Sequence, residues 1–147
     1  AYDYGDVSGY TPIMKMYTLG HNFMPPGIHA GGLRYHGDSP LVSQLLNEGQ
    51  IEALAVPQVA TFDAGVQFAR AEGIIPAPES CHAIRAAIDE ALKCKITGEP
   101  KTILFSLTGH GHFDMASYDK FFSGQLEDFD YPAEAIAESL KHLPKVG

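Results

Sequence analysis

Apolar residues recur at helical spacing in several stretches of this chain. After Ser39-Pro40, an N-cap followed by a proline at the first helical position, leucines stand at positions 41, 45 and 46 until Gly49. Thr61 is a second candidate cap, for a helix with Phe62 and Val66 on one face that ends at Gly73. Both stretches therefore predict helices that bury one face.

The clearest helical pattern ends near Gly98. Its apolar residues are spaced i, i+3, i+4, i+7 and i+8, at Ile84, Ala87, Ile88, Ala91 and Leu92. Two further helices are predicted over 114–122 and 132–143, the second with Ile136 and Leu140 inward.

Two continuous apolar runs of strand length stand between these helices, IEALAV at 51–56 and TILFSL at 102–107. The order helix, strand, helix, helix, strand, helix, helix predicts an α/β layered domain with a parallel sheet. Ligands of such sheets bind beyond the carboxyl ends of the strands. That rule selects the loop from Thr108 to Gly111, with the loop after Ile75 beside it.

The first 38 residues differ in composition from the rest of the chain. They are rich in Gly, Pro, His and aromatic residues, as in HNFMPPGIHAGGLRYHG at 21–37. This composition favours an ordered loop over a regular element. We therefore expect residues 1–38 to form a loop segment that faces a cofactor or ligand cleft, and residues 39–147 to form the α/β part.

Charge and cysteine content narrow the classes of function. The net charge of -8 and the pI of about 5.2 disfavour nucleic acid and anionic membranes as partners. No apolar run approaches the roughly 20 residues that span a membrane. Cys81 and Cys94 fall in one predicted helix, roughly 20 Å apart and too distant for a disulfide. A reducing, cytoplasmic setting is the expectation.

The segment TGHGHFD, at 108–114, places a hydroxyl and two glycines at the end of a predicted strand. The glycines would let the backbone approach a planar ligand, while Thr108 offers a hydroxyl to a ring nitrogen. His110, His112 and Asp114 could instead bind a metal, although the Cys/His pairs of zinc sites are absent. A plain tight turn is the structural alternative.

Two charged residues admit a structural and a functional interpretation. Glu79 opens the longest predicted helix, where it either interacts with the helix dipole or steers protonation of a bound substrate. Arg34 either clamps a carboxylate or phosphate or is an ordinary surface arginine. None of the seven lysines has the glycine-rich or histidine-flanked context expected of a Schiff-base nucleophile.

These segments, in this order and at these separations, resemble the C-terminal portion of tryptophan synthase β-chains. EGIIPAPES at 72–80 is close to the family's EGIIPA-x-ES signature, and LTGHGHFD at 107–114 takes the place of its LSGRG-x-x-D segment. MYTLGHNFMPPGIHAGGLRYHG at 16–37 is more similar to the divergent second branch, the β-like one. The resemblance covers nearly the whole chain and implies the C-terminal part of a fold type II pyridoxal-phosphate enzyme.

Carried over residue by residue, the resemblance implies a pyridoxal 5'-phosphate site. Thr108 would hydrogen-bond the pyridine nitrogen, and Glu79 would assist protonation and elimination of the serine hydroxyl. Gly32 would lie in a loop near the cofactor. The residues that would line the ring are Gly109, His110 and Gly111.

The resemblance also implies a monovalent cation held by the backbone carbonyls of Tyr35 and Gly37. Arg34 departs from the common branch, which has an aspartate that contacts the amino-acid intermediate. The positive charge of Arg34 suits an anionic leaving group, so we hypothesise that O-phosphoserine replaces L-serine as the donor. His110 replaces the usual arginine, and the sequence offers no account of that change.

The implied activity is that of a lyase, condensation of L-serine or O-phosphoserine with indole to L-tryptophan by β-replacement. The cofactor lysine and the phosphate-binding loop belong to the N-terminal two-thirds of the family, and neither pattern occurs here. We therefore expect a fragment that is inactive alone, with the missing N-terminal half and a second copy in a homodimer as partners. The alternatives are a noncatalytic module that binds a ligand or partner and, third, a metal-binding protein.

Overall fold

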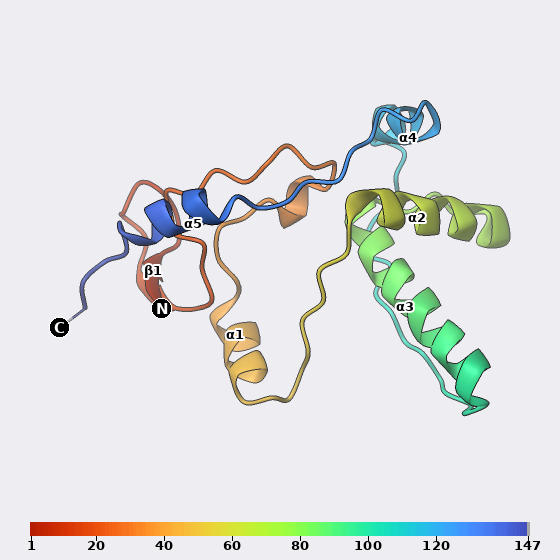
Figure 1. The fold of residues 1–147 in the computed structure, drawn as a ribbon, viewed down its shortest axis with the longest axis horizontal. Coiled ribbons are helices and arrows are strands. Elements are labelled where there is room, and N and C mark those ends of the chain that lie inside the picture. The colour runs from red at the N-terminus through yellow and green to blue at the C-terminus, as the bar shows by residue number, and fades with distance from the viewer. Residues whose placement is uncertain (147) are drawn as a thin grey trace. The chain divides into compact units, whose positions relative to one another are not determined.

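The computed structural model describes residues 1–146, and most of its regular structure is helical (Figure 1). The chain forms two compact units. The first unit comprises Ala1–Gly27, Arg34–Leu54 and the chain from Asp130 onward, and the second comprises Ile28–Leu33 and Ala55–Phe129. The division expected at residue 38 stays a prediction.

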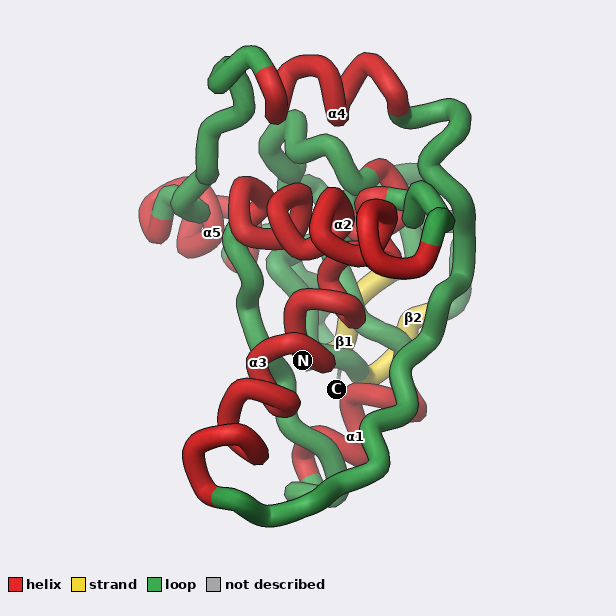
Figure 2. Tube along the Cα trace, turned by 90° about the vertical axis from the view of Figure 1, so that its right-hand side faces the viewer, coloured by secondary structure: helices red, strands yellow, loops and turns green. Residues whose placement is uncertain are grey.

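An antiparallel hairpin opens the first unit. Strand β1 (Tyr2–Tyr4) pairs with β2 (Ile13–Lys15), and the two are drawn in yellow in Figure 2. The ladder continues through Ala1 and Met16, whose backbone groups exchange bonds of 2.8 and 2.9 Å. The expectation of a loop without regular elements is wrong here, because strands of three residues are too short to leave a periodic signal.

Two short helices complete the first unit, α1 (Pro40–Asn47) and α5 (Ala133–Leu140). Pro40 occupies the first turn of α1, as predicted, and α5 lies within the predicted range. Their buried residues are serines, Ser43 in α1 and Ser139 in α5, whereas Leu140 is exposed. The expected inward direction of Leu140 is therefore wrong, whereas Ile136 on the same helix is partly buried.

The second unit is built on two packed helices, α2 (Gln58–Glu72) and α3 (Pro78–Thr97). Each ends at a left-handed glycine, Gly73 (φ 71°) and Gly98 (φ 73°), as the sequence predicts. The prediction that Thr61 caps α2 is wrong, because the helix begins at Gln58. The hydroxyl of Thr61 is buried and donates to the carbonyl of Gln58 at 2.7 Å instead.

Helix α4 (Met115–Phe122) and the 3-10 helix η1 (Gly31–Leu33) pack against this pair. Gly65 of α2 permits the close approach, since a Cβ there would lie 2.5 Å from the sulfur of Cys81 and 3.0 Å from the hydroxyl of Tyr118. The buried residues of this core are Phe62, Val66, Cys81, Tyr118 and Leu126.

The predicted parallel sheet is not confirmed, because within residues 1–146 the only sheet is the β1–β2 pair. Residues 52–56 and 102–107 have no regular secondary structure, and no strand of residues 1–146 pairs with them. The second segment runs back along α3 (Figure 1) and turns Phe105 onto Phe68, with ring centroids 5.8 Å apart. Ile103 and Phe105 are partly buried, whereas Leu104, which lies between these two in the sequence, is 97% exposed. This alternation is that of a strand with one face covered.

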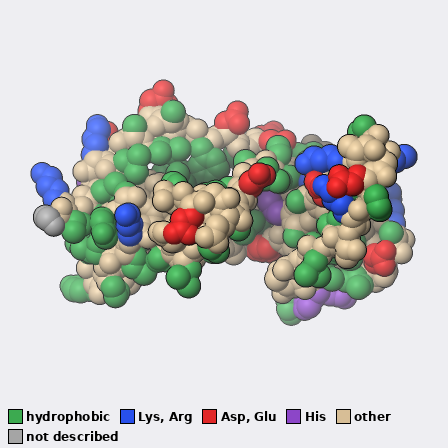
Figure 3. Space-filling view, turned by 90° about the horizontal axis from the view of Figure 1, so that it is seen from below, with side chains coloured by type: hydrophobic (Ala, Val, Ile, Leu, Met, Phe, Trp, Pro, Cys, Tyr) green, Lys and Arg blue, Asp and Glu red, His purple; other side chains and the backbone are tan. Residues whose placement is uncertain are grey.

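Figure 3 shows many apolar side chains exposed on one face of the molecule. By accessible surface, the most exposed leucines of the chain include Leu41, Leu54 and Leu104. Cys81 and Cys94 both lie in α3 as free thiols, as the helical spacing predicts. In the part of the chain that the structure describes, no helix combines the length and hydropathy needed to cross a membrane.

Replacing Phe62 by alanine tests the core of the second unit. Its side chain is 1% exposed and packs edge-on against Tyr118, with centroids 5.0 Å apart. Phe62→Ala should lower the free energy of unfolding by about 3 to 5 kcal/mol, measured by urea denaturation. Phe113→Ala is the matched control, because Phe113 is 92% exposed. An equal loss from both variants would contradict this core.

Candidate functional site

Two loops far apart in sequence meet in the second unit. The amide of Ala77 donates to the carbonyl of Gly109 at 2.9 Å, and the amide of Gly111 donates to that of Ile75 at 2.8 Å. Pro76 and His110 face each other between these bonds. The expectation that the loop after Ile75 lies beside the loop from Thr108 to Gly111 is confirmed. We call this pairing of 75–77 with 109–111 the loop clamp.

The glycines of the loop clamp allow the two backbones to touch. A Cβ on Gly111 would lie 2.5 Å from the carbonyl oxygen of Pro76, and one on Gly109 would lie 3.1 Å from the Cβ of Ala77. The sequence suggested a role for these glycines in approaching a ligand. The geometry shows that they let one loop approach the other.

Tyr118 supports the loop clamp from the core. Its hydroxyl donates to the carbonyl of Pro76 at 2.6 Å and lies 3.4 Å from the sulfur of Cys81. Burial, reinforced by Cys81, raises the pKa of Tyr118 far above its ordinary value, so the phenol stays a neutral donor. Burial likewise raises the pKa of the Cys81 thiol.

Ser80 joins the start of α3 to the loop clamp. Its hydroxyl oxygen is 3.1 Å from the amide nitrogen of Thr108, 3.2 Å from that of Gly109 and 3.1 Å from the Thr108 hydroxyl. Thr108 itself is exposed. The structure thus brings Thr108 against the residue that follows Glu79.

Glu79 and Gly32 are also brought together. The carboxylate of Glu79 is half-buried, and its Oε1 accepts the amide of Gly32 at 2.8 Å. A Cβ on Gly32 would approach the same oxygen to 3.3 Å. This bond ties η1 to the first turn of α3 and fixes one of the two carboxylate oxygens.

His29, just before η1, also helps to hold this element in place, a role that the sequence did not indicate. His29 donates its amide to Gln58 at 3.3 Å, and its Nδ1 lies 3.0 Å from the hydroxyl of Ser117. Burial, with a smaller contribution from Lys120, lowers the pKa of His29, which favours the neutral ring. Contacts between positions this far apart leave no local signal in the sequence.

The histidines of the TGHGHFD segment form an exposed aromatic group. The rings of His110 and His112 are 4.9 Å apart, and Phe113 lies 5.4 Å from His110. Nowhere in residues 1–146 do three His, Cys, Asp or Glu side chains converge as a metal site would require. The alternative in which Asp114 completes a metal site with these histidines is therefore not supported.

Arg34, Tyr35 and Gly37 belong to the first unit. The guanidinium of Arg34 donates from Nε to the carbonyl of Pro26 at 2.9 Å and from Nη2 to that of Pro25 at 3.4 Å. Two of its five N–H groups are thus used, and the side chain is exposed.

The two carbonyls predicted to bind a cation, those of Tyr35 and Gly37, flank the carbonyl of His36, which accepts hydrogen bonds. The carbonyl of His36 accepts the amide of Leu19 at 2.7 Å and the hydroxyl of Thr18 at 3.3 Å. Across the hydrogen bonds of the described chain, the carbonyls of Tyr35 and Gly37 on either side accept none.

A buried carboxylate anchors this loop. Asp3 is fully buried and accepts the Thr18 hydroxyl at 2.6 Å, while His21 lies at 2.6 Å and His36 at 3.8 Å. Burial alone raises the pKa of Asp3, but hydrogen bonds from Thr18, His21 and Tyr4 outweigh it and hold that pKa below its ordinary value. The charged form is therefore the stable one.

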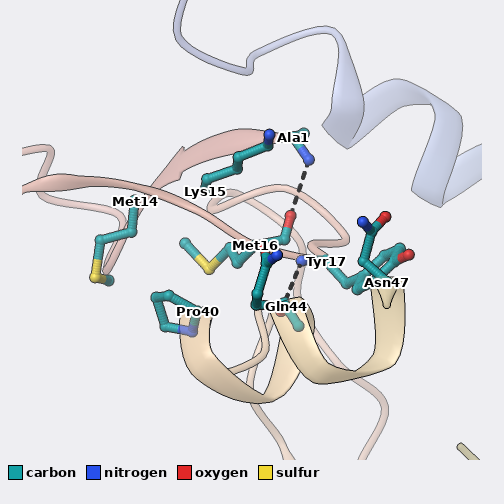
Figure 4. Close-up of a pocket in the computed structure, with 9 residues that line it drawn as sticks. Ala1, Met14, Lys15, Met16, Tyr17, Pro40, Gln44 and Asn47 are labelled. Carbon is teal, nitrogen blue, oxygen red and sulfur yellow. Dashed lines mark hydrogen bonds between the residues drawn. The ribbon is translucent and has the colours of Figure 1, made fainter. Parts of the chain in front are cut away.

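Each unit also contains a cavity. That of the first unit, about 460 Å³, lies between α1 and the end of the hairpin, where Figure 4 shows Gln44 and Asn47 near Met16 and Tyr17. The groove of the second unit, about 410 Å³, is apolar and lies between α2, α3 and the extended segment at 103–105. Neither lining includes the residues predicted for chemistry.

No family model matches the chain, but curated proteins do. It is 69% identical over 125 residues to tryptophan synthase beta chain 2 of Methanosarcina acetivorans, which covers 85% of this chain and 28% of that protein. The protein of the same name from Aquifex aeolicus is 65% identical over 127 residues, 86% of this chain and 29% of its own length.

Tryptophan synthase beta chain of Pyrococcus horikoshii is 55% identical over 129 residues, 88% of this chain and 28% of its own length. The chain therefore spans little more than a quarter of the length of the relatives it matches, in their C-terminal portion. The resemblance read from the motifs is confirmed.

The Asp3 network predicts a specific loss of stability in acid. Because the folded-state pKa of Asp3 lies below the unfolded value, its contribution is present above the unfolded pKa and is lost as pH falls through the folded pKa. Asp3→Asn should therefore flatten the acid side of the stability curve, by at most about 1.4 kcal/mol per pH unit. Urea midpoints between about pH 6 and 3 measure this. Asp38→Asn, at an exposed carboxylate, should keep the original slope.

Proposed function

Because its sequence is that of the C-terminal portion of the tryptophan synthase β-chain family, we propose that this chain forms one wall of a pyridoxal 5'-phosphate site. The complete enzyme would be a lyase that makes L-tryptophan from indole and L-serine or O-phosphoserine by β-replacement. The observation that carries the proposal is the 3.1 Å contact between Ser80 and Thr108, which places an exposed hydroxyl beside the Glu79 turn.

We propose that Thr108 and the 109–111 side of the loop clamp receive the cofactor. When bound, pyridoxal phosphate supplies the electron sink for elimination and replacement at the amino-acid side chain. Thr108 would offer its hydroxyl to the ring nitrogen, and a neutral partner leaves that nitrogen largely unprotonated. Gly109, His110 and Gly111 would line the ring.

Glu79 is proposed as the group that moves a proton. Its Oε1 is held by the amide of Gly32 at 2.8 Å, so the carboxylate has a fixed orientation and a second oxygen to offer. A positioned carboxylate can accept a proton and then, as the carboxylic acid, donate it to a departing hydroxyl. Gly32 would then lie at the edge of the cofactor site because of this bond.

Two features of the first unit support further ligands of the same enzyme. The carbonyls of Tyr35 and Gly37 accept no hydrogen bond among the described residues and are proposed to bind a monovalent cation. The exposed guanidinium of Arg34 keeps three N–H groups, five less the two used, and is proposed to bind the phosphate of O-phosphoserine.

The remaining portion of the enzyme is proposed as the partner that completes the fold. Residues 51–56 and 102–107 form two mainly apolar runs, and no strand of residues 1–146 pairs with them. Unpaired backbone groups on an apolar strand are costly to bury without partners. We therefore assign both segments to the parallel layered sheet of the fold type II architecture, with strands of the N-terminal portion beside them. A second copy would make the homodimer.

The role of Glu79 can be tested in a polypeptide that joins the N-terminal portion of the Methanosarcina acetivorans relative to this chain. Glu79→Gln should lower kcat for tryptophan formation at least about 100-fold, while cofactor absorbance shows unchanged binding. Glu72→Gln changes an exposed glutamate of the same unit and should leave kcat unchanged. Full activity of Glu79→Gln, or no cofactor binding by the unmutated polypeptide, would reject the proposal.

The donor can be tested in the same polypeptide. Arg34→Gln should lower kcat/KM for O-phosphoserine by about 10-fold or more and leave that for serine nearly unchanged, because a charge-assisted contact is lost for one donor only. Arg70→Gln, at an exposed arginine of α2, is the control. Equal or better use of plain serine by the unmutated enzyme would rule out O-phosphoserine as the preferred donor.

A further inference from the structure

We infer that Ser80 is a positioning residue that fixes the direction in which the Thr108 hydroxyl donates its proton, an inference that rests on the proposed cofactor site. Ser80 lies in the first turn of α3 and is 1% exposed. Its hydroxyl is therefore shielded from water, and its partners are those given by the fold.

The hydrogen bonds of Ser80 can be counted. A serine hydroxyl has one proton to donate and two lone pairs that accept. Backbone amides can only donate, and those of Thr108 and Gly109 point at this oxygen from 3.1 and 3.2 Å. Both lone pairs of the Ser80 hydroxyl are thus occupied.

The remaining partner of Ser80 must then be an acceptor. The hydroxyl oxygen of Thr108 lies 3.1 Å away, within reach of the Ser80 proton. If Ser80 donates in this contact, Thr108 accepts, and the proton of Thr108 is directed away from Ser80. Because Thr108 is exposed, that proton faces the side from which a ligand would approach.

The loop clamp keeps this arrangement rigid. The amide of Ala77 holds the carbonyl of Gly109 at 2.9 Å, and Tyr118 holds Pro76 at 2.6 Å. The Thr108 hydroxyl is therefore a hydrogen-bond donor of fixed direction. Such a donor can bind a ring nitrogen that is unprotonated and keeps its lone pair. The specificity for an unprotonated ring nitrogen would come from Ser80 acting through Thr108.

The test uses the joined polypeptide described above, loaded with pyridoxal phosphate labelled at the ring nitrogen. Ser80→Ala should shift the nuclear resonance of that nitrogen toward the value without a hydrogen bond, and should weaken cofactor binding by up to about 10-fold. Ser80→Thr keeps the hydroxyl and should restore the signal. Ser106→Ala removes an exposed serine nearby and is the matched control.

A second measurement separates positioning from simple anchoring. Ser80→Ala should speed hydrogen exchange at the amides of Thr108 and Gly109 at least about 10-fold, because both lose their acceptor. Thr108→Val leaves Ser80 in place, so it should change the ring-nitrogen signal without changing the Gly109 exchange rate. This variant also keeps the test available if Ser80→Ala fails to fold.

The outcomes are distinct. Faster exchange with an unchanged ring-nitrogen signal in Ser80→Ala would make Ser80 an anchor only and overturn the inference. Unchanged exchange would overturn it as well. If the unmutated polypeptide binds no cofactor, the proposed function fails and this inference fails with it. If it binds the cofactor and Ser80→Ala leaves the ring-nitrogen signal unchanged, only the inference is rejected.

Discussion

The loop clamp is the contact on which the candidate site depends. Two backbone bonds join 75–77 to 109–111, and they form only because Gly111 lets a carbonyl lie where a side chain would otherwise stand. Tyr118 and Ser80 then stabilise the loop clamp. The phenol of Tyr118, in the apolar core, donates to the carbonyl of Pro76, and the hydroxyl of Ser80, in the first turn of α3, accepts the amide of Gly109. Thr108 is thereby brought into contact with Ser80, the residue after Glu79, across 28 positions of sequence.

The helices could be predicted from the sequence because their signals are local. Proline at the start of α1 and glycines after α2 and α3 stand where the structure uses them. The sheet could not be confirmed, since the apolar runs at 51–56 and 102–107 find no partner strand within the described chain. The burial of Leu140 in α5 could not be predicted either. An apolar helix face indicates that something covers it but does not identify what does.

The site was predictable in part. The resemblance singled out Glu79, Gly32 and Thr108. In the structure the amide of Gly32 donates to the Glu79 carboxylate, and the hydroxyl of Thr108 contacts that of Ser80, the residue after Glu79. Ser80 lies inside the same motif, yet its role depends on two amides of a distant loop. Tyr118 carries no motif at all. The roles of both residues follow from contacts between segments that are far apart in the sequence.

The two thiols of α3 stand in very different surroundings. Cys81 is buried against Tyr118, and burial raises its pKa, so its reactive thiolate is scarce. Cys94 lies near the open end of the same helix and is only partly covered. A maleimide dye should therefore attach at one position without any engineering, giving a fluorescent reporter on α3 that leaves the serine and glutamate at the helix's other end untouched.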